Sequence, residues 1–240
     1  MSGLSDKIRA ARVPFASAVI VAGGSGSRFG GDKLAAELGG MPVLARTLLR
    51  FEEAPLVKEI VIAAREDAIP AVVNLCREYR ITKAVNVVPG GETRLLSSLN
   101  GVLATSKKAR IIAIHDGARP LVADKIIEDA IWNAHLHLAA APAVPVKQTV
   151  KVARDRIVVD TPERSALFAV QTPQCFQRDL ILAALTAAAE KYPDVTDDCM
   201  AVERIGGQIW LTDGDEENIK ITTPLDLAIA ELVLKRRNDT

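Results

Sequence analysis

Short apolar runs alternate with amphipathic stretches along most of this 240-residue chain. Four of the runs are rich in valine and isoleucine, as strands that are buried on both faces of a sheet should be. Between them, apolar residues recur at intervals of three and four, which is typical of a helix that buries one face. The predicted strands cover 17–22, 58–64, 84–88 and 110–115, with one more at 208–212, and the predicted helices cover 42–53, 92–104 and 124–138.

The order of these elements predicts an α/β protein with a mostly parallel, Rossmann-like sheet flanked by helices. A last helix should begin at Thr223-Pro224, because threonine is a good N-cap and proline fits the first helical turn. Ligands of such sheets bind beyond the carboxyl ends of the strands. The segments 23–33, 89–91 and 115–116, which follow three of the strands, should therefore converge on one edge of the sheet.

Residues 143–160 interrupt this alternation. Two runs of strand-forming residues flank the polar segment 153–156, and this pattern predicts a β-hairpin. A two-stranded hairpin is only marginally stable by itself. We therefore expect 143–165 to form a protruding arm that packs on another subunit, within a single domain that spans 1–240.

A glycine-rich loop follows the first predicted strand. Residues 19–33 contain five glycines and two cations, Arg28 and Lys33. Glycines let backbone N–H groups approach phosphate oxygens closely, and the cations can offset the remaining charge. A dinucleotide fingerprint would have a third glycine where Phe29 stands, and a P-loop would have Ser or Thr after its lysine. The loop therefore indicates a nucleotide bound in neither of these two ways, with a plain glycine-rich turn as the alternative.

The overall composition narrows the range of partners. Basic and acidic residues balance at 30 each and aromatic residues make up 4%, so neither a nucleic-acid interface nor an anionic membrane surface is indicated. Cys76, Cys175 and Cys199 lack the spacing of a disulfide framework or a metal site, and we expect them to be small buried residues. The chain has neither a signal-peptide core nor an apolar run of 18 residues, so we expect a soluble, cytoplasmic protein.

Four further polar clusters contain the residue types that phosphate chemistry requires. Each alone has a structural explanation, such as a helix-entry turn at Gly90, a capping role for Asp116 or a buried structural role for His115. Lys220 lies in an apolar, strand-like context, where a lone lysine is least expected. The clusters are 90–94 with Ser97, 115–120, Arg164 with 171–174, and 218–222.

Taken together, these motifs resemble those of the 2-C-methyl-D-erythritol 4-phosphate cytidylyltransferase family of the non-mevalonate isoprenoid pathway. The resemblance extends from about Val19 to Leu234, and the motifs come in family order. They are AGGSGSR, GGETRLLSS, HDGARP, TPQ, TDD and NIKITTPLDL, of which HDGARP and NIKITTP together are highly specific. The family joins CTP to methylerythritol phosphate and releases pyrophosphate, on a nucleotidyltransferase fold with a dimerisation arm.

The resemblance implies a role for each matching residue. Arg28, Lys33, Arg164 and Lys220 would be the catalytic cations. Mg²⁺ would be the cofactor, held mainly by the triphosphate, and Asp116 could add one protein ligand. The arm would form a homodimer and carry its residues into the neighbouring site. The nucleotide would be bound by Ala22, Gly23, Gly24, Ser25, Gly26, Glu92, Ser97, Asp116 and Gly117, and the acceptor by Arg119, Thr149, Arg164, Thr172 and Thr196.

Two positions depart from the family pattern, and other functions share parts of it. Four residues separate Arg28 from Lys33, a shorter connection than is usual in the family, and Glu92 replaces the commoner aspartate. A ribitol-5-phosphate or other polyol-phosphate cytidylyltransferase is the nearest rival activity. A non-catalytic nucleotide-binding regulatory module is the alternative from a different class. A nicotinamide-dependent oxidoreductase is disfavoured by the incomplete dinucleotide fingerprint.

Overall fold

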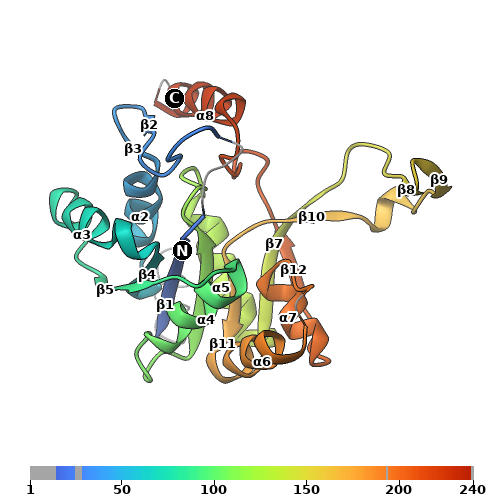
Figure 1. The fold of residues 1–240 in the computed structure, drawn as a ribbon, viewed down its shortest axis with the longest axis horizontal. Coiled ribbons are helices and arrows are strands. Elements are labelled where there is room, and N and C mark those ends of the chain that lie inside the picture. The colour runs from blue at the N-terminus through green and yellow to red at the C-terminus, as the bar shows by residue number, and fades with distance from the viewer. Residues whose placement is uncertain (1–14, 25–28, 193, 239–240) are drawn as a thin grey trace, which may run out of the picture.

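The computed structural model describes residues 15–24, 29–192 and 194–238. In this part of the chain, one eight-stranded sheet runs through the centre and helices cover both of its faces (Figure 1). The strands lie in the order β10-β7-β11-β6-β1-β4-β5, and β12 also pairs with β7. Their bounds are β1 (Ala16–Ala22), β4 (Val57–Ala64), β5 (Ala84–Pro89), β6 (Ile111–Asp116), β7 (Ala139–Pro145), β10 (Phe168–Val170), β11 (Gln174–Gln177) and β12 (Trp210–Asp213).

The predicted alternation of strands and helices is confirmed, and the observed element ends lie within two residues of the predicted ones. Strand β1 pairs in parallel with both β4 and β6, so that Ile20 lies opposite Ile62 on one side and His115 on the other. Strands β11 and β10 run antiparallel to their neighbours, and the other strand pairs are parallel, so the sheet is mostly parallel. The helices are α2 (Val43–Glu53), α3 (Ile69–Glu78), α4 (Arg94–Leu103), α5 (Asp124–His137), α6 (Arg178–Lys191), α7 (Asp198–Arg204) and α8 (Pro224–Asn238), and short elements are β2 (Glu37–Leu38), β3 (Met41–Pro42), η1 (Glu66–Ala68) and η2 (Arg164–Ala166).

The alternation of side chains along β1 divides the hydrophobic core into two halves. Ala18 and Ile20 belong to the cluster that α2, α3 and α5 cover, whereas Val19 belongs to the cluster that α4, α6 and α7 cover. All three side chains are fully buried. Burial on both faces explains why β1, β4 and β6 are continuous apolar runs in the sequence. The same expectation was wrong for β5, which lies at the edge of the sheet and is half-buried to exposed.

The predicted arm projects from the body of the molecule, but its hairpin is shorter than expected (Figure 1). Residues 143–145, which were expected to open the hairpin, belong to β7 of the central sheet and pair with β10. Farther out, β8 (Val152–Arg154) and β9 (Ile157–Asp160) form the antiparallel hairpin. The sequence pattern did not separate the two parts because a central strand continues directly into the arm.

Gly101 in α4 packs directly against β1. A Cβ atom at this position would lie 2.3 Å from Cγ1 of Val19, which is itself fully buried. We expect Gly101→Ala to lower the free energy of unfolding by about 1–3 kcal/mol, because overpacking outweighs the better helix propensity of alanine. Urea unfolding measures the change, and Gly31→Ala is the control, since a Cβ atom there would meet nothing within 4 Å. A Gly101→Ala variant as stable as the wild type would contradict this packing.

Candidate active site

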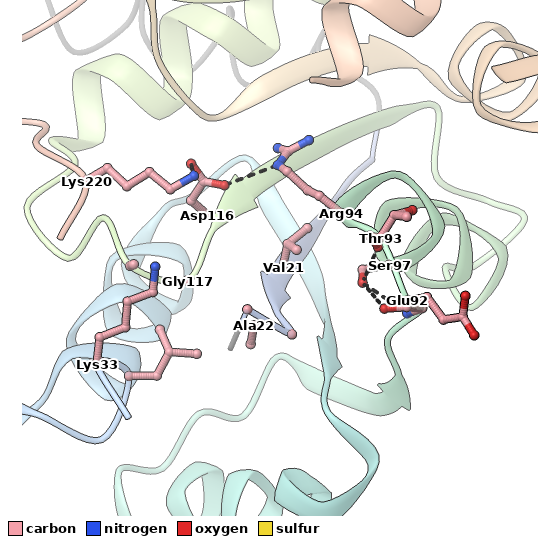
Figure 2. A pocket seen from close by; sticks show the side chains of 15 residues that line it. Val21, Ala22, Lys33, Glu92, Thr93, Arg94, Ser97, Asp116, Gly117 and Lys220 are labelled. Carbon is pink, nitrogen blue, oxygen red and sulfur yellow. Dashed lines mark hydrogen bonds and ion pairs between the residues drawn. The ribbon is translucent and has the colours of Figure 1, made fainter. Parts of the chain in front are cut away.

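A cavity of about 290 Å³ opens at the carboxyl ends of the parallel strands (Figure 2). Its walls come from the segments that follow β1, β5 and β6 and from the segment before α8. The predicted convergence of three strand ends is therefore confirmed. The lining residues are Val21, Ala22, Gly23, Gly24, Lys33, Leu34, Gly91, Glu92, Thr93, Arg94, Ser97, Asp116, Gly117, Ala118 and Lys220.

Asp116, the last residue of β6, is the centre of a charge cluster in this cavity. Its Oδ2 lies 3.0 Å from Nζ of Lys220 and 3.3 Å from Nε of Arg119. Its Oδ1 lies 3.5 Å from Nε of Arg94 (Figure 2). Burial raises the pKa of Asp116, but attraction by the three cations outweighs this and holds the pKa well below its usual range. The carboxylate thus stays ionised at neutral pH, and the cluster as a whole presents positive charge to the cavity.

Hydrogen bonds between distant motifs place Lys220 beside Asp116. Nη1 of Arg119 donates to the carbonyl oxygen of Asn218 at 2.6 Å. The side-chain amide of Asn218, which is fully buried, donates to the carbonyl oxygen of Thr172 at 2.9 Å. The segment that carries Lys220 is therefore tied both to the loop after β6 and to the segment before β11.

His115 is buried behind Asp116 and holds the loop after β6 in place. Its Nε2 lies 3.2 Å from the carbonyl oxygen of Arg119, and its Nδ1 lies 2.9 Å from Oγ1 of Thr172. A carbonyl oxygen can only accept, so Nε2 carries the proton and Nδ1 accepts from the threonine hydroxyl. Burial lowers the pKa of His115 to about 3, so the ring is neutral at physiological pH. This is the structural role expected from the sequence.

Thr172 is engaged inside the protein. Its Oγ1 accepts from the backbone N–H of Asp116 at 3.2 Å while its own proton is directed at His115. The residue is 3% exposed. The contact with an acceptor that the resemblance implies for Thr172 stays a prediction.

Ser97 in α4 ties two parts of the cavity wall together. Its Oγ accepts from the N–H of Gly91 at 3.0 Å and donates to the carbonyl oxygen of Thr93 at 2.9 Å. A Cβ atom on Gly90 would lie 3.0 Å from this Oγ, and one on Gly23 would lie 3.4 Å from it. The absence of a side chain at Gly90 therefore lets the end of β5 approach the serine closely, whereas a Cβ atom at Gly23 would only make an ordinary contact.

Lys33 and Glu92 lie on opposite sides of the cavity in the view of Figure 2. The ammonium group of Lys33 points toward Gly117, whereas the carboxylate of Glu92 points away from Asp116. The predicted roles of Ser25, Gly26 and Arg28 fall on residues outside the described ranges and stay predictions.

The acceptor residues predicted on the arm are not brought to this cavity within one chain. Thr149 and Arg164 are exposed on the arm, where Nη1 of Arg164 donates to the carbonyl oxygen of Lys147 at 3.2 Å. Figure 1 shows the arm pointing away from the sheet that carries the cavity. Thr196 is exposed in the segment before α7. A site that combined the arm with the cluster around Asp116 would need a second copy of the chain.

The sequence analysis quoted Arg94 and Asp198 within motifs but gave them no role. Arg94 lines the cavity, and its Nη1 lies 2.7 Å from Oδ2 of Asp198, whose side chain is fully buried. One signal was present in the sequence. Arg94 is the first residue of α4, where the helix dipole disfavours a cation, so a specific anionic partner was to be expected there.

Other sequence expectations concern cysteines, metals and membranes. Cys175 and Cys199 are buried, as expected, and burial raises the pKa of both thiols. Cys76 was also expected to be buried but is only half-buried, and this burial raises the pKa of its thiol to about 11. Among the residues that the structure describes, no group of three or more His, Cys, Asp or Glu side chains could hold a metal ion. Within the same residues, no helix is both long enough and apolar enough to cross a bilayer.

Comparison with known proteins decides the family. The model of the family described as 2-C-methyl-D-erythritol 4-phosphate cytidylyltransferase matches residues 16–236. The chain belongs to this family. A member from Caldanaerobacter subterraneus subsp. tengcongensis is 44% identical over 224 residues, which are 92% of this chain and 99% of that protein. A member from Clostridium novyi is 43% identical over 222 residues, which are 91% of this chain and 96% of that protein.

Solved structures related to this cytidylyltransferase family share the fold. The 4-diphosphocytidyl-2C-methyl-D-erythritol synthase from Anaerococcus prevotii matches with a TM-score of 0.83 and 31% identity, covering 92% of this chain and 99% of that one. The 2-C-methyl-D-erythritol 4-phosphate cytidylyltransferase from Thermus thermophilus matches with a TM-score of 0.75 and 28% identity, covering 90% and 98%. The family and the fold that the motifs implied are thus confirmed.

The buried His115 predicts how the stability of this cytidylyltransferase-family protein depends on pH. Its pKa is about 3 in the folded protein and 6.5 in the unfolded chain, so the unfolded state binds the proton first. The stabilising contribution of the neutral His115 ring is therefore fully present well above pH 6.5, and it is lost as the pH falls from 6.5 toward 3. Between pH 6.5 and 5, we expect the free energy of unfolding to fall by about 1–2 kcal/mol through His115.

Urea unfolding over this pH range checks the prediction. The variant His115→Gln should lose most of the dependence, and His135→Gln, at an exposed position, should keep it. An unchanged dependence in His115→Gln would show that another group is responsible.

Proposed function

We propose that this protein joins CTP to 2-C-methyl-D-erythritol 4-phosphate, giving 4-diphosphocytidyl-2-C-methyl-D-erythritol and pyrophosphate. One observation carries the proposal: the cluster around Asp116 presents Lys220 and Arg94 to a glycine-lined cavity, in a chain of this family. Two polyanions meet in the reaction, and preorganised cations stabilise the charge that develops between them. The acceptor follows from family membership. The location we propose is the cytoplasm, where CTP is available.

The reaction requires no general base from the protein. The attacking oxygen of the acceptor phosphate is already anionic at neutral pH. It forms a bond to the α-phosphorus of CTP while the bond between that phosphorus and the bridging oxygen of the β-phosphate breaks. Pyrophosphate leaves with the bridging oxygen and its electron pair. Lys33 and Lys220, which line the cavity together with Arg94, would offset negative charge on the α-phosphate and the leaving pyrophosphate. The cavity wall would also align the attacking oxygen with the α-phosphorus, which adds to the rate.

Magnesium is the cofactor that we assign to this chemistry. Magnesium prefers oxygen ligands and commonly takes most of them from phosphates and water. Oδ1 of Asp116 could serve as this ligand and keep its contact with Arg94 at 3.5 Å, because a carboxylate oxygen has two lone pairs. We propose that the ion enters with the triphosphate and that Asp116 adds one ligand. When bound, it would offset phosphate charge beside the protein's own cations.

The homodimer that we propose places each arm against the partner's body. Side chains 157–159 on the arm are 54–70% exposed, although all three are large and apolar. A groove of about 630 Å³ lies at the base of the arm, with Phe168 and Leu211 among its walls. Mutual docking would cover such apolar surface, which monomeric proteins rarely leave exposed in large patches. It would also carry Thr149 and Arg164 toward the partner's cavity.

Pyrophosphate release tests the proposed function. With CTP and Mg²⁺, the wild type should release pyrophosphate in the presence of 2-C-methyl-D-erythritol 4-phosphate and form the cytidine diphosphate alcohol in equal amount. Release with ribitol 5-phosphate alone would instead make the protein a polyol-phosphate cytidylyltransferase. Calorimetric binding of CTP without turnover of either acceptor would favour the regulatory nucleotide-binding module.

Mixed subunits test whether the active site is shared. Lys220→Ala and Arg164→Ala should each be impaired alone, the first by about 10²–10³ in kcat because a cation at the reacting phosphates is lost. In a mixed dimer one of the two sites keeps both side chains, so random mixing should restore about a quarter of wild-type activity. Mass spectrometry of the intact mixture is the control that shows whether mixed dimers form. No recovery with Arg164→Ala would mean that Arg164 acts within its own chain.

A further inference from the structure

We propose that Asp198 is a positioning residue, which holds Arg94 so that Arg94 orients the carboxylate of Asp116 toward Lys220. The inference rests on the proposed function and adds to it a residue that lies outside the cavity wall. It concerns an ion pair between the half-buried Arg94 of α4 and the buried Asp198 of α7, two helices on the same face of the sheet. The pair connects the interior of the protein with the charge cluster at the cavity.

The burial of Asp198 is the first observation. Its side chain is completely buried in the first turn of α7, and burial raises its pKa. An ionised carboxylate in such a place is costly unless it is paired and hydrogen-bonded. Its Oδ2 lies 2.7 Å from Nη1 of Arg94, so the two side chains form an ion pair, although neither carboxylate oxygen has a well-directed hydrogen bond. Packing alone would be served as well by an apolar side chain of similar volume, so the pair indicates a role in the site.

The geometry of Arg94 is the second observation. Its Nη1 faces Asp198, while its Nε faces Oδ1 of Asp116 at 3.5 Å. Figure 2 shows the side chain extending from α4 toward Asp116. A guanidinium group is planar and rigid, so an anchor at one nitrogen fixes the direction of the others. Asp198 therefore determines how Arg94 meets the carboxylate at the cavity.

Arg94 can orient the carboxylate of Asp116 because the two carboxylate oxygens have different partners. Oδ1 faces Arg94, whereas Oδ2 faces Lys220 and Arg119. Loss of the Arg94 contact would let the carboxylate group rotate, and Lys220 would then lose a fixed partner. Because Lys220 is assigned to the reacting phosphates, the loss should lower turnover more than nucleotide affinity.

Hydrogen bonds with Gln174 hold the backbone of Asp198 in place. Oε1 of the buried Gln174 accepts from the backbone N–H groups of Asp198 and Cys199, each at 3.0 Å. The amide nitrogen of Gln174 donates to Oδ2 of Asp197 at 2.8 Å. The start of α7 is thus held to β11, and its position relative to β6 follows from the antiparallel pairing of β11 with β6.

Asp198→Asn tests the inference, because it removes the charge and keeps the shape of the side chain. We expect kcat to fall about 10–100-fold, as is typical when an outer partner of a functional group is removed, and the KM for CTP to change less than about threefold. Glu59→Gln is the matched control. Glu59 is also buried and hydrogen-bonded, to Ser17 and to the N–H of Ser106, but it lies in β4 and outside the cavity wall. It should change stability and leave kcat near the wild-type value.

A double-mutant cycle separates positioning from general damage. If Asp198 acts through Arg94, the variant Asp198→Asn/Arg94→Gln should be no slower than Arg94→Gln alone. Fully additive losses would overturn the inference, and so would a wild-type kcat in Asp198→Asn.

One further readout is independent of turnover. Exchange of the Arg94 Nε–H with water, followed by NMR, should be slow in the wild type and in Glu59→Gln and fast in Asp198→Asn. Unchanged exchange in Asp198→Asn would overturn the inference. A wild type that releases no pyrophosphate would refute the proposed function instead, so the two failures are distinguishable.

Discussion

The attraction between the buried carboxylate of Asp116 and the cations around it determines the arrangement of this site. Lys220, Arg119 and Arg94 come from different segments and would repel one another if they met without an anion. Charge interactions are stronger in a partly buried site than in water, so one carboxylate can hold several cations in fixed directions. The outcome is a positively charged wall that is already in place in the protein alone, and the proposed reaction would need such a wall for electrostatic catalysis without reorganisation.

The sheet is what brings these charges together. Asp116 ends a central strand, and Gly90, just after the end of β5, lies against Ser97 in the wall of the same cavity. Behind the carboxylate, His115 stays neutral and uses both ring nitrogens to hold the loop, so it adds no positive charge that would compete for Asp116. The buried ring thus supports the loop without changing the charge of the cluster. Fold stability and site geometry therefore depend on the same short segment, 115–119.

Much of the fold and part of the site could be predicted from the sequence, for physical reasons that differ between elements. Parallel strands are buried on both faces and appear as valine- and isoleucine-rich runs, so β1, β4 and β6 were found. Strand β11 and helix α6 were not predicted. Strand β11 is only four residues long with glutamine at both ends, and α6 is apolar on most sides, so neither segment shows the regular spacing of apolar and polar residues that identifies a strand or a helix. Glycine motifs located the cavity. The pairing of Arg94 with Asp198 joins positions far apart in the chain, which periodicity and motif spacing do not relate.

The most direct test of this account is the single-turnover rate of an Asp116→Asn variant with saturating CTP, Mg²⁺ and 2-C-methyl-D-erythritol 4-phosphate. The amide fills the same space but removes the charge that holds three cations. If that anion organises the site, the rate of pyrophosphate formation falls by at least about 10²-fold while the variant remains folded by urea unfolding. A folded variant with a rate within about twofold of the wild type would contradict the account.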